Sequence, residues 1–155
     1  MIAQEVTAWN TAMEMTKEGL RPPIVHAATG LCRNRLRSLY RAVHGKGAVQ
    51  GRVSEYAYNR LKTKNQVIEA TIYYQIYYGL GGKEIFRILD PVLFLKAYKA
   101  YKGYSPDCID VTTAWFVARD LRENLLTPRR CQACGREYLY VPRSEQMSRC
   151  PLCAG

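Results

Sequence analysis

Hydrophobic side chains recur every three to four positions along most of this chain, a spacing that places them on one face of a helix. Ile2, Val6 and Trp9 begin the first stripe, and Gly19 follows it as a stop signal. The pattern predicts a succession of amphipathic helices, which run over 2–18, 22–29, 33–43 and 54–78, then from 91 through 101 and from 111 through 125.

Capping and breaking residues punctuate this pattern. Asp90 and Asp110 are predicted N-caps, and the glycines at 79, 81 and 82 end the fourth helix. In that helix the pattern of Leu61, Ile68, Ile72 and Ile76 fits helical spacing. No strand-like alternation precedes residue 136, and the first β-compatible run is 138–141. We therefore predict a mainly α fold, with a helical body over 1–126 and a small module over 127–155.

The composition is that of a folded, soluble chain. Of its 155 residues 48% are hydrophobic, which is enough for a buried core. No stretch approaches the ~20 apolar residues of a membrane span, and the first residues lack a secretory signal. We expect a cytoplasmic protein that does not bind membranes. In that reducing compartment the six cysteines are free thiols or metal ligands rather than disulfides.

The positive charge is concentrated in one segment. The formal net charge is +10, and residues 21–62 hold nine basic side chains and one acidic one. A surplus confined to forty-two residues indicates a face that binds a polyanion such as nucleic acid. The alternative is a solvated helix face without a partner.

Four cysteines near the C-terminus form the most specific motif. Cys131 and Cys134 make one C-x2-C pair, and after fifteen residues Cys150 and Cys153 make a second. This spacing is typical of a zinc ribbon, in which Gly135 can take the positive φ of the turn and one Zn²⁺ per chain replaces a core that so short a module lacks. Because all four ligands are cysteines, no position stays open for water, and we expect a structural ion rather than a catalytic one.

Other uses of these cysteines are two disulfides, a thioredoxin-like redox pair or an iron–sulfur cluster. The first fits a reducing compartment poorly, and the second lacks a βαβ context. Cys32 and Cys108 have no partner at ligand spacing, and we expect both to be small buried hydrophobic residues.

Residues 24–43 of the basic segment have the sequence pattern of a helix-turn-helix. Gly30 allows the sharp turn, and Leu31, Leu36 and Leu39 would hold the two helices together. Arginine can read guanine and asparagine can read adenine, while serine and arginine also bind phosphates. The predicted DNA-binding residues of the second helix are therefore Arg33, Asn34, Arg35, Arg37, Ser38 and Arg41. A generic basic helix and an RNA contact are the alternatives.

Two further features bear on function. Tyr73, Tyr74, Tyr77 and Tyr78 form adjacent pairs four residues apart, for which a core and a protein interface are favoured over base stacking. The two histidines stand without a paired cysteine or serine, and Gly81-Gly82-Lys83 lacks the spacing of a phosphate loop. We expect no enzymatic activity and no catalytic residues.

Taken together, these features resemble one family. The resemblance is carried by residues 30–40, by the helix that begins VLFLKAYKAY at Val92, by TAWFVAR from Thr113, and by the four cysteines. The chain resembles the FlhC family, the C subunits of the bacterial flagellar master transcriptional activator. That resemblance implies a hetero-oligomer with a small helical partner, FlhD, which binds promoter DNA and recruits RNA polymerase. It also implies that Cys131, Cys134, Cys150 and Cys153 are zinc ligands.

We accordingly predict a DNA-binding transcriptional activator subunit that acts on flagellar promoters, or on those of a conjugative element in a divergent homologue. Its partners would be double-stranded promoter DNA, an FlhD-like subunit and RNA polymerase. A zinc-ribbon interaction adaptor and an RNA-binding factor are the alternatives.

Overall fold

Helices make up most of the computed structural model, which describes residues 2–49, 51, 56–142 and 150–153. Its elements are α1 (Ile2–Glu18), α2 (Pro22–Thr29), α3 (Arg33–His44), η1 (Ala57–Asn59), α4 (Lys64–Gly81), η2 (Gly82–Phe86), α5 (Pro91–Tyr104), α6 (Val111–Arg122), β1 (Thr127–Arg130) and β2 (Glu137–Tyr140), where η denotes a 3-10 helix. The predicted mainly α fold is confirmed. No helix within the described ranges has the length and apolar character needed to cross a bilayer.

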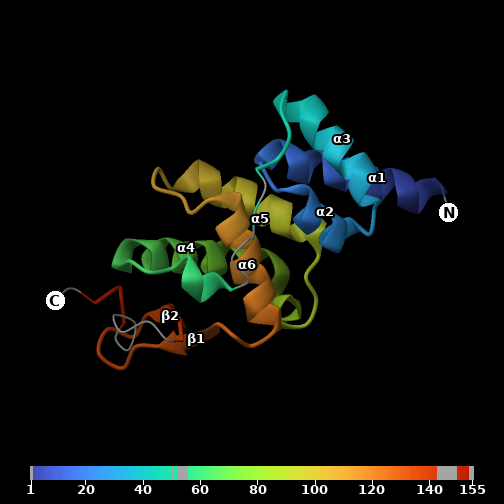
Figure 1. Cartoon of the computed structure of the whole chain (residues 1–155). Coiled ribbons are helices and arrows are strands. Elements are labelled where there is room, and N and C mark those ends of the chain that lie inside the picture. Colours follow the sequence, from blue (N-terminus) through green and yellow to red (C-terminus); the bar gives the residue numbers. More distant parts are fainter. Residues whose placement is uncertain (1, 50, 52–55, 143–149, 154–155) are drawn as a thin grey trace.

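Three groups of elements follow one another across the molecule (Figure 1). Helices α1, α2 and α3 contact one another at one end, α4 contacts α5 and α6 in the middle, and the β1–β2 hairpin lies on α4 at the other end. Helix α1 also contacts α5, where Lys99 Nζ lies 2.8 Å from Glu14 Oε2 and Lys102 Nζ lies 3.2 Å from Glu18 Oε2. The arginine-rich helix and the cysteine module are thus held at opposite ends of one scaffold.

The predicted helix starts at Asp90 and Asp110 are confirmed by their capping bonds. An Asp90 carboxylate oxygen accepts a hydrogen bond from the Val92 amide at 3.0 Å, and one from Asp110 accepts from the Thr113 amide at 2.7 Å. Each bond satisfies an amide that has no partner inside the first helical turn. These local signals place α5 and α6 correctly.

Helix α4 begins later than the predicted residue 54. Thr63 and Gln66 form a capping box, in which the side-chain oxygen of each residue accepts a hydrogen bond from the backbone amide of the other. The helix therefore starts at Lys64. Residue 54 lies outside the described residues, and Ala57–Asn59 is a separate 3-10 turn. Of the residues that indicated this helix, Leu61 is buried but precedes it, whereas Ile68, Ile72 and Ile76 lie on it and are partly buried. The fully buried face consists of Val67, Ala70, Thr71, Tyr73, Tyr74 and Tyr77.

The chain leaves α6 earlier than predicted and forms a strand that the sequence pattern did not indicate. The helix ends at Arg122, Asn124 takes a positive φ of 60°, and Leu125 is 39% exposed while Leu126 is buried. Strand β1 then pairs antiparallel with β2, so that Thr127 faces Tyr140 and Arg130 faces Glu137. The expectation of no strand before residue 136 is thereby corrected, since β1 is specified by its partner strand rather than by its own alternation.

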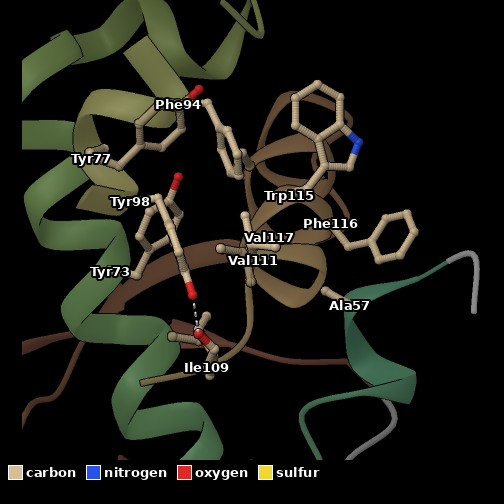
Figure 2. Close-up of a cluster of buried hydrophobic side chains, with 14 of the residues drawn as sticks. Ala57, Tyr73, Tyr77, Phe94, Tyr98, Ile109, Val111, Trp115, Phe116 and Val117 are labelled. Carbon is tan, nitrogen blue, oxygen red and sulfur yellow. Dashed lines mark hydrogen bonds between the residues drawn. The ribbon is translucent and has the colours of Figure 1, made fainter. Parts of the chain in front are cut away.

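Aromatic rings fill the space between α4, α5 and α6 (Figure 2). Tyr73 and Tyr77 stack with their centroids 5.6 Å apart, and Tyr101 meets Tyr73 edge-on at 5.7 Å. Phe94 meets Trp115 edge-on at 5.1 Å, which joins α5 to α6. The predicted core role of the tyrosine pairs is confirmed for Tyr73, Tyr74 and Tyr77, while Tyr78 is 37% exposed.

A buried carboxylate ties the η1 turn to α6. Asp120 is 0% exposed, and its Oδ2 accepts a hydrogen bond from the Ala57 amide at 2.7 Å. Burial raises the pKa of Asp120, while the Ala57 amide and the Arg119 guanidinium oppose the rise by favouring the charged form. This bond holds the segment that follows α3 against the core.

Replacing this carboxylate is expected to destabilise the protein in a graded way. Asp120→Ala leaves the buried Ala57 amide without an acceptor and should lower the free energy of unfolding by about 1–3 kcal/mol. Asp120→Asn keeps an amide oxygen that can accept the same bond, and it should lose clearly less. Chemical denaturation of both variants measures the difference, and equal losses would mean that the Ala57 bond contributes little.

Candidate nucleic-acid interface and metal centre

Helices α2 and α3 are joined by a short turn at Gly30, as in the predicted helix-turn-helix. Gly30 takes a φ of 75°, in the left-handed region that glycine adopts without steric cost, and its amide donates to the His26 carbonyl at 2.8 Å. His26 Nδ1 donates in turn to the Leu31 carbonyl at 2.6 Å, so the His26 side chain bridges the turn between the two helices. Leu36 is 1% exposed and locks α3 onto its neighbours.

The predicted DNA-binding residues all lie on the exposed surface of α3. Arg33, Arg37 and Arg41 follow at intervals of four residues, which puts them on one face of the helix. Asn34 and Ser38 lie beside them, with Arg37 Nη1 donating to Asn34 Oδ1 at 3.5 Å and Ser38 Oγ donating to the Asn34 carbonyl at 3.2 Å. These five residues, which we call the arginine face, present hydrogen-bond donors and acceptors together.

Arg35 lies apart from the arginine face. Its guanidinium carbon is 4.5 Å from the centroid of the Trp9 ring on α1, a cation–π contact that holds the side chain against the neighbouring helix. Residues two positions apart on a helix point in different directions, so Arg35 and Arg37 do not act at one point. The structure therefore brings five of the six predicted residues together and attaches the sixth to α1.

The arginine face keeps its positive charge. Within the described ranges, no carboxylate lies at ion-pair distance from Arg33, Arg37 or Arg41, whereas Glu14 and Glu18 of α1 are paired with lysines of α5. The hydrogen bond from Lys99 holds the pKa of Glu14 below its usual value, so this acid stays charged and occupied. The field in front of α3 therefore attracts polyanions.

Arg21 was not among the predicted DNA-binding residues and contributed only to the charge of residues 21–62. In the structure it lines a pocket together with Arg37 and Arg41. Its position directly before Pro22 and Pro23 was the available signal, since two prolines fix the start of α2 and hence the place of Arg21.

The four predicted metal ligands meet at one point. The Sγ atoms of Cys131, Cys134, Cys150 and Cys153 all lie within 4.8 Å of one another. Cys131 Sγ is 3.4 Å from Cys153 Sγ, and Cys134 Sγ is 3.8 Å from Cys150 Sγ. Four sulfurs at ~2.3 Å from a central tetrahedral zinc lie ~3.8 Å apart, so this arrangement fits a single four-coordinate ion.

The backbone of the first cysteine pair forms a tight turn. The Gly135 amide donates to the Cys131 carbonyl at 2.8 Å, and the Cys131 amide donates to the Arg136 carbonyl at 2.8 Å. Gly135 takes the predicted positive φ, at 75°. The Cys134 amide lowers the pKa of Cys131 to about 6, whereas the thiols of Cys131 and Cys134 raise the pKa of Cys153 to about 12. The four sulfurs could therefore all be thiolates together only with a cation between them to offset their repulsion.

The cysteine module is attached to the helical body by its hairpin. Tyr74 Oη donates to Glu137 Oε1 at 2.7 Å, and the Leu139 amide donates to Thr71 Oγ1 at 3.2 Å. Leu139 and Val141 are 0% and 1% exposed and belong to the same buried cluster as the core of the helices. The module thus rests on α4 rather than extending from it.

The remaining two cysteines differ in burial, and only Cys108 packs against the core. Cys32 is exposed at the N-cap of α3, where the Arg35 and Asn34 amides lower its pKa, so the prediction of a buried residue was wrong. Cys108 is partly buried and its Sγ donates to the Ser105 carbonyl at 2.8 Å.

Comparison with known proteins points to one family. Residues 1–155 match the model of the family described as FlhC, flagellar transcriptional activator. A flagellar transcriptional regulator FlhC of Sodalis glossinidius (strain morsitans) is 30% identical over 144 residues, which cover 89% of this chain and 72% of the relative. The proteins of the same name from Enterobacter cloacae subsp. cloacae and Yersinia enterocolitica are 24% and 27% identical, and the matches cover 99% and 98% of this chain and 82% and 81% of the relatives.

Losing one of the four clustered thiols should release bound metal and loosen the hairpin. We expect Cys134→Ser to hold much less metal than wild type by elemental analysis, whereas the matched change Cys32→Ser, outside the cluster, holds as much as wild type. Because metal binding contributes to folding of such a module, the Leu139 amide should exchange faster with solvent in Cys134→Ser. Equal metal content in the two variants would show that the cluster does not bind the ion.

Proposed function

The chain belongs to the FlhC family of flagellar transcriptional activators, and from this premise we propose that it binds promoter DNA through the arginine face of α3. The bound DNA would be double-stranded, and the promoters would be flagellar, or those of a conjugative element in a divergent member of the family. The adaptor and RNA-binding alternatives are not favoured by the family. We also propose that the protein regulates transcription and catalyses no reaction.

The observation that carries this proposal is the unpaired positive charge of the arginine face. Arg33, Arg37 and Arg41 are exposed on one side of a helix of twelve residues, and within the described ranges no acid neutralises them. An α-helix fits the major groove of B-DNA, where an arginine can donate two hydrogen bonds to guanine and an asparagine can pair with adenine. Asn34 and Ser38 lie at the same surface, so base and phosphate contacts can be made together.

The six residues would divide these tasks by position. Those at the start of α3, Arg33 and Asn34, would face base edges, because recognition helices usually present their N-terminal residues to the groove. Arg37, Ser38 and Arg41 would contact phosphates. Arg35, which stacks on Trp9, would act beside them on the flank toward α1.

We further propose that the four cysteines hold one Zn²⁺ per chain. A set of four thiolates at tetrahedral spacing suits zinc, and it leaves no position open for substrate or water. The ion would supply the cross-link that a short module needs in place of a core. Its role would be structural: the hairpin kept closed by the ion presents Glu137 and Leu139 to α4.

A small helical partner of the FlhD type is the second part of the proposed assembly, a hetero-oligomer that would recruit RNA polymerase in the cytoplasm, where bacterial promoters are. Support comes from apolar side chains left exposed around the junction of α4, η2 and α5: Leu80 is 47%, Ile88 55% and Val92 54% exposed. An amphipathic helix of a partner buries its apolar face against such a surface.

Removing charge from the arginine face should weaken DNA binding more than removing the same charge elsewhere. We expect Arg33→Gln with Arg37→Gln to reduce affinity for a flagellar promoter duplex at least tenfold and to lower the salt slope by ~0.9 per lost phosphate contact. The matched double change, Lys83→Gln with Lys96→Gln, removes two exposed charges from η2 and α5. Fluorescence anisotropy across a salt series measures both.

Equal losses in the two double variants would indicate a non-specific effect of net charge, and unchanged affinity in the α3 variant would contradict the assignment of α3. Circular dichroism of each variant verifies that the helices are intact. A preference for single-stranded RNA over the duplex would favour the RNA-binding alternative.

The partner surface can be tested by co-purification. A charge at Ile88 should be costly only when that position is buried by another subunit, so Ile88→Asp should lower recovery of a co-expressed FlhD-like subunit several-fold. Tyr104→Asp is the control, because Tyr104 is 74% exposed at the end of α5. If both variants retain the partner fully, the contact lies elsewhere.

A further inference from the structure

A pocket of about 170 Å³ opens beside α3 and is lined by three arginines, Arg21, Arg37 and Arg41. Its other walls are Pro22 and Pro23 at the start of α2 and the described residues of the 47–51 segment. No carboxylate is among the described residues that line it. Three guanidinium groups in one small pocket repel one another unless an anion lies between them.

The geometry of Arg21 is already organised for such an anion. Its Nη1 donates to the Val49 carbonyl at 2.7 Å and lies 3.5 Å from the Gly51 carbonyl, which anchors one edge of the guanidinium. A planar guanidinium held at one edge keeps its remaining N–H groups pointing in one direction, so less entropy is lost when they bind. Gly47 lies close to Arg41, since a side chain there would meet Arg41 Nη2 at 3.7 Å.

Arg37 and Arg41 connect this pocket to the arginine face. The same two residues also line a second hollow with Ser38 and Ala42 on the surface of α3. A ligand in the pocket would therefore lie alongside whatever polymer lies across α3. Arginine binds phosphate oxygens through paired N–H donors, and in duplex DNA phosphates border the groove that a helix enters.

We propose that this pocket binds one phosphate group of the DNA backbone, held by Arg21, Arg37 and Arg41. The inference rests on the proposed DNA binding by α3, and it adds Arg21 and the pocket walls at residues 47–49 and 51 to the contact. A phosphate at this place fixes the depth and rotation of α3 relative to the groove, and it does so independently of base sequence.

The experiment compares Arg21→Gln, Arg21→Lys and Lys83→Gln in the complex with its co-purified partner. Anisotropy of a labelled promoter duplex gives the dissociation constant across a salt series. We expect Arg21→Gln to lower the salt slope by ~0.9, the value of one lost phosphate contact, and Arg21→Lys to restore it because a lysine also neutralises a phosphate. Lys83→Gln, outside the pocket, should keep the wild-type slope.

A second pair of variants keeps the test valid if Arg21→Gln disturbs the 47–51 segment. Val49 accepts the hydrogen bond from Arg21 with its backbone carbonyl, so a change of the Val49 side chain keeps this bond. Val49 is also 74% exposed, which leaves room for a larger side chain. Val49→Glu brings a carboxylate to the pocket, and Val49→Gln is its uncharged match. We expect the glutamate variant to bind duplex more weakly than the glutamine variant, by about tenfold at low salt.

Equal salt slopes for Arg21→Gln, Lys83→Gln and wild type, together with equal affinities for the two Val49 variants, would overturn the inference. The arginine face would still stand as the DNA-binding surface if the Arg33 and Arg37 double variant binds weakly. Inorganic pyrophosphate distinguishes the source of the phosphate: if it raises the melting temperature of wild type but not of Arg21→Gln while the DNA slopes are equal, the pocket serves a free phosphate compound. That result also overturns binding of the DNA backbone.

Discussion

The packing of tyrosine rings between α4 and α5 is the interaction on which the rest of the structure depends. Tyr73 is completely buried, stacks on Tyr77 and meets Phe94 and Tyr101 edge-on. Large aromatic side chains bury more apolar area than any others, and their edge-to-face contacts fix the angle between the helices. Three other parts are attached to this pair: α1 by ion pairs to α5, η1 through α6, and the hairpin through α4.

This arrangement separates the two candidate sites while connecting both to one core. Helix α3 and the β1–β2 hairpin of the cysteine module lie at opposite ends of the molecule (Figure 1). The cysteine module reaches the core through Tyr74 and Thr71, on the same helix that carries Tyr73. An ion bound in the module would therefore stabilise α4 from outside, whereas α3 is supported by its contacts with α1 and α2.

Charge is distributed according to the same division. The lysines of α5 that face α1 are used in ion pairs with Glu14 and Glu18, which hold the scaffold together at exposed sites of modest strength. The arginines of α3 have no such partner within the described residues and remain available to a ligand. The pocket beside α3 extends this surplus toward the start of α2, where Arg21 is held by backbone carbonyls rather than by an acid.

The sequence by itself determined the features that depend on neighbours along the chain. The caps at Asp90 and Asp110, the turn at Gly30, the two C-x2-C pairs and the four-residue spacing of the arginines are local, because each involves residues close together along the chain. The tertiary structure decided what depends on distant partners. Strand β1 exists because β2 pairs with it, and Tyr73 rather than Ile72 faces the core because of where α5 lies. Arg35 is held against α1 because the Trp9 ring lies there, and Arg21 joins Arg37 and Arg41 because the Val49 carbonyl accepts a hydrogen bond from it. Such contacts depend on how whole helices and strands pack together, which no single stretch of the sequence determines.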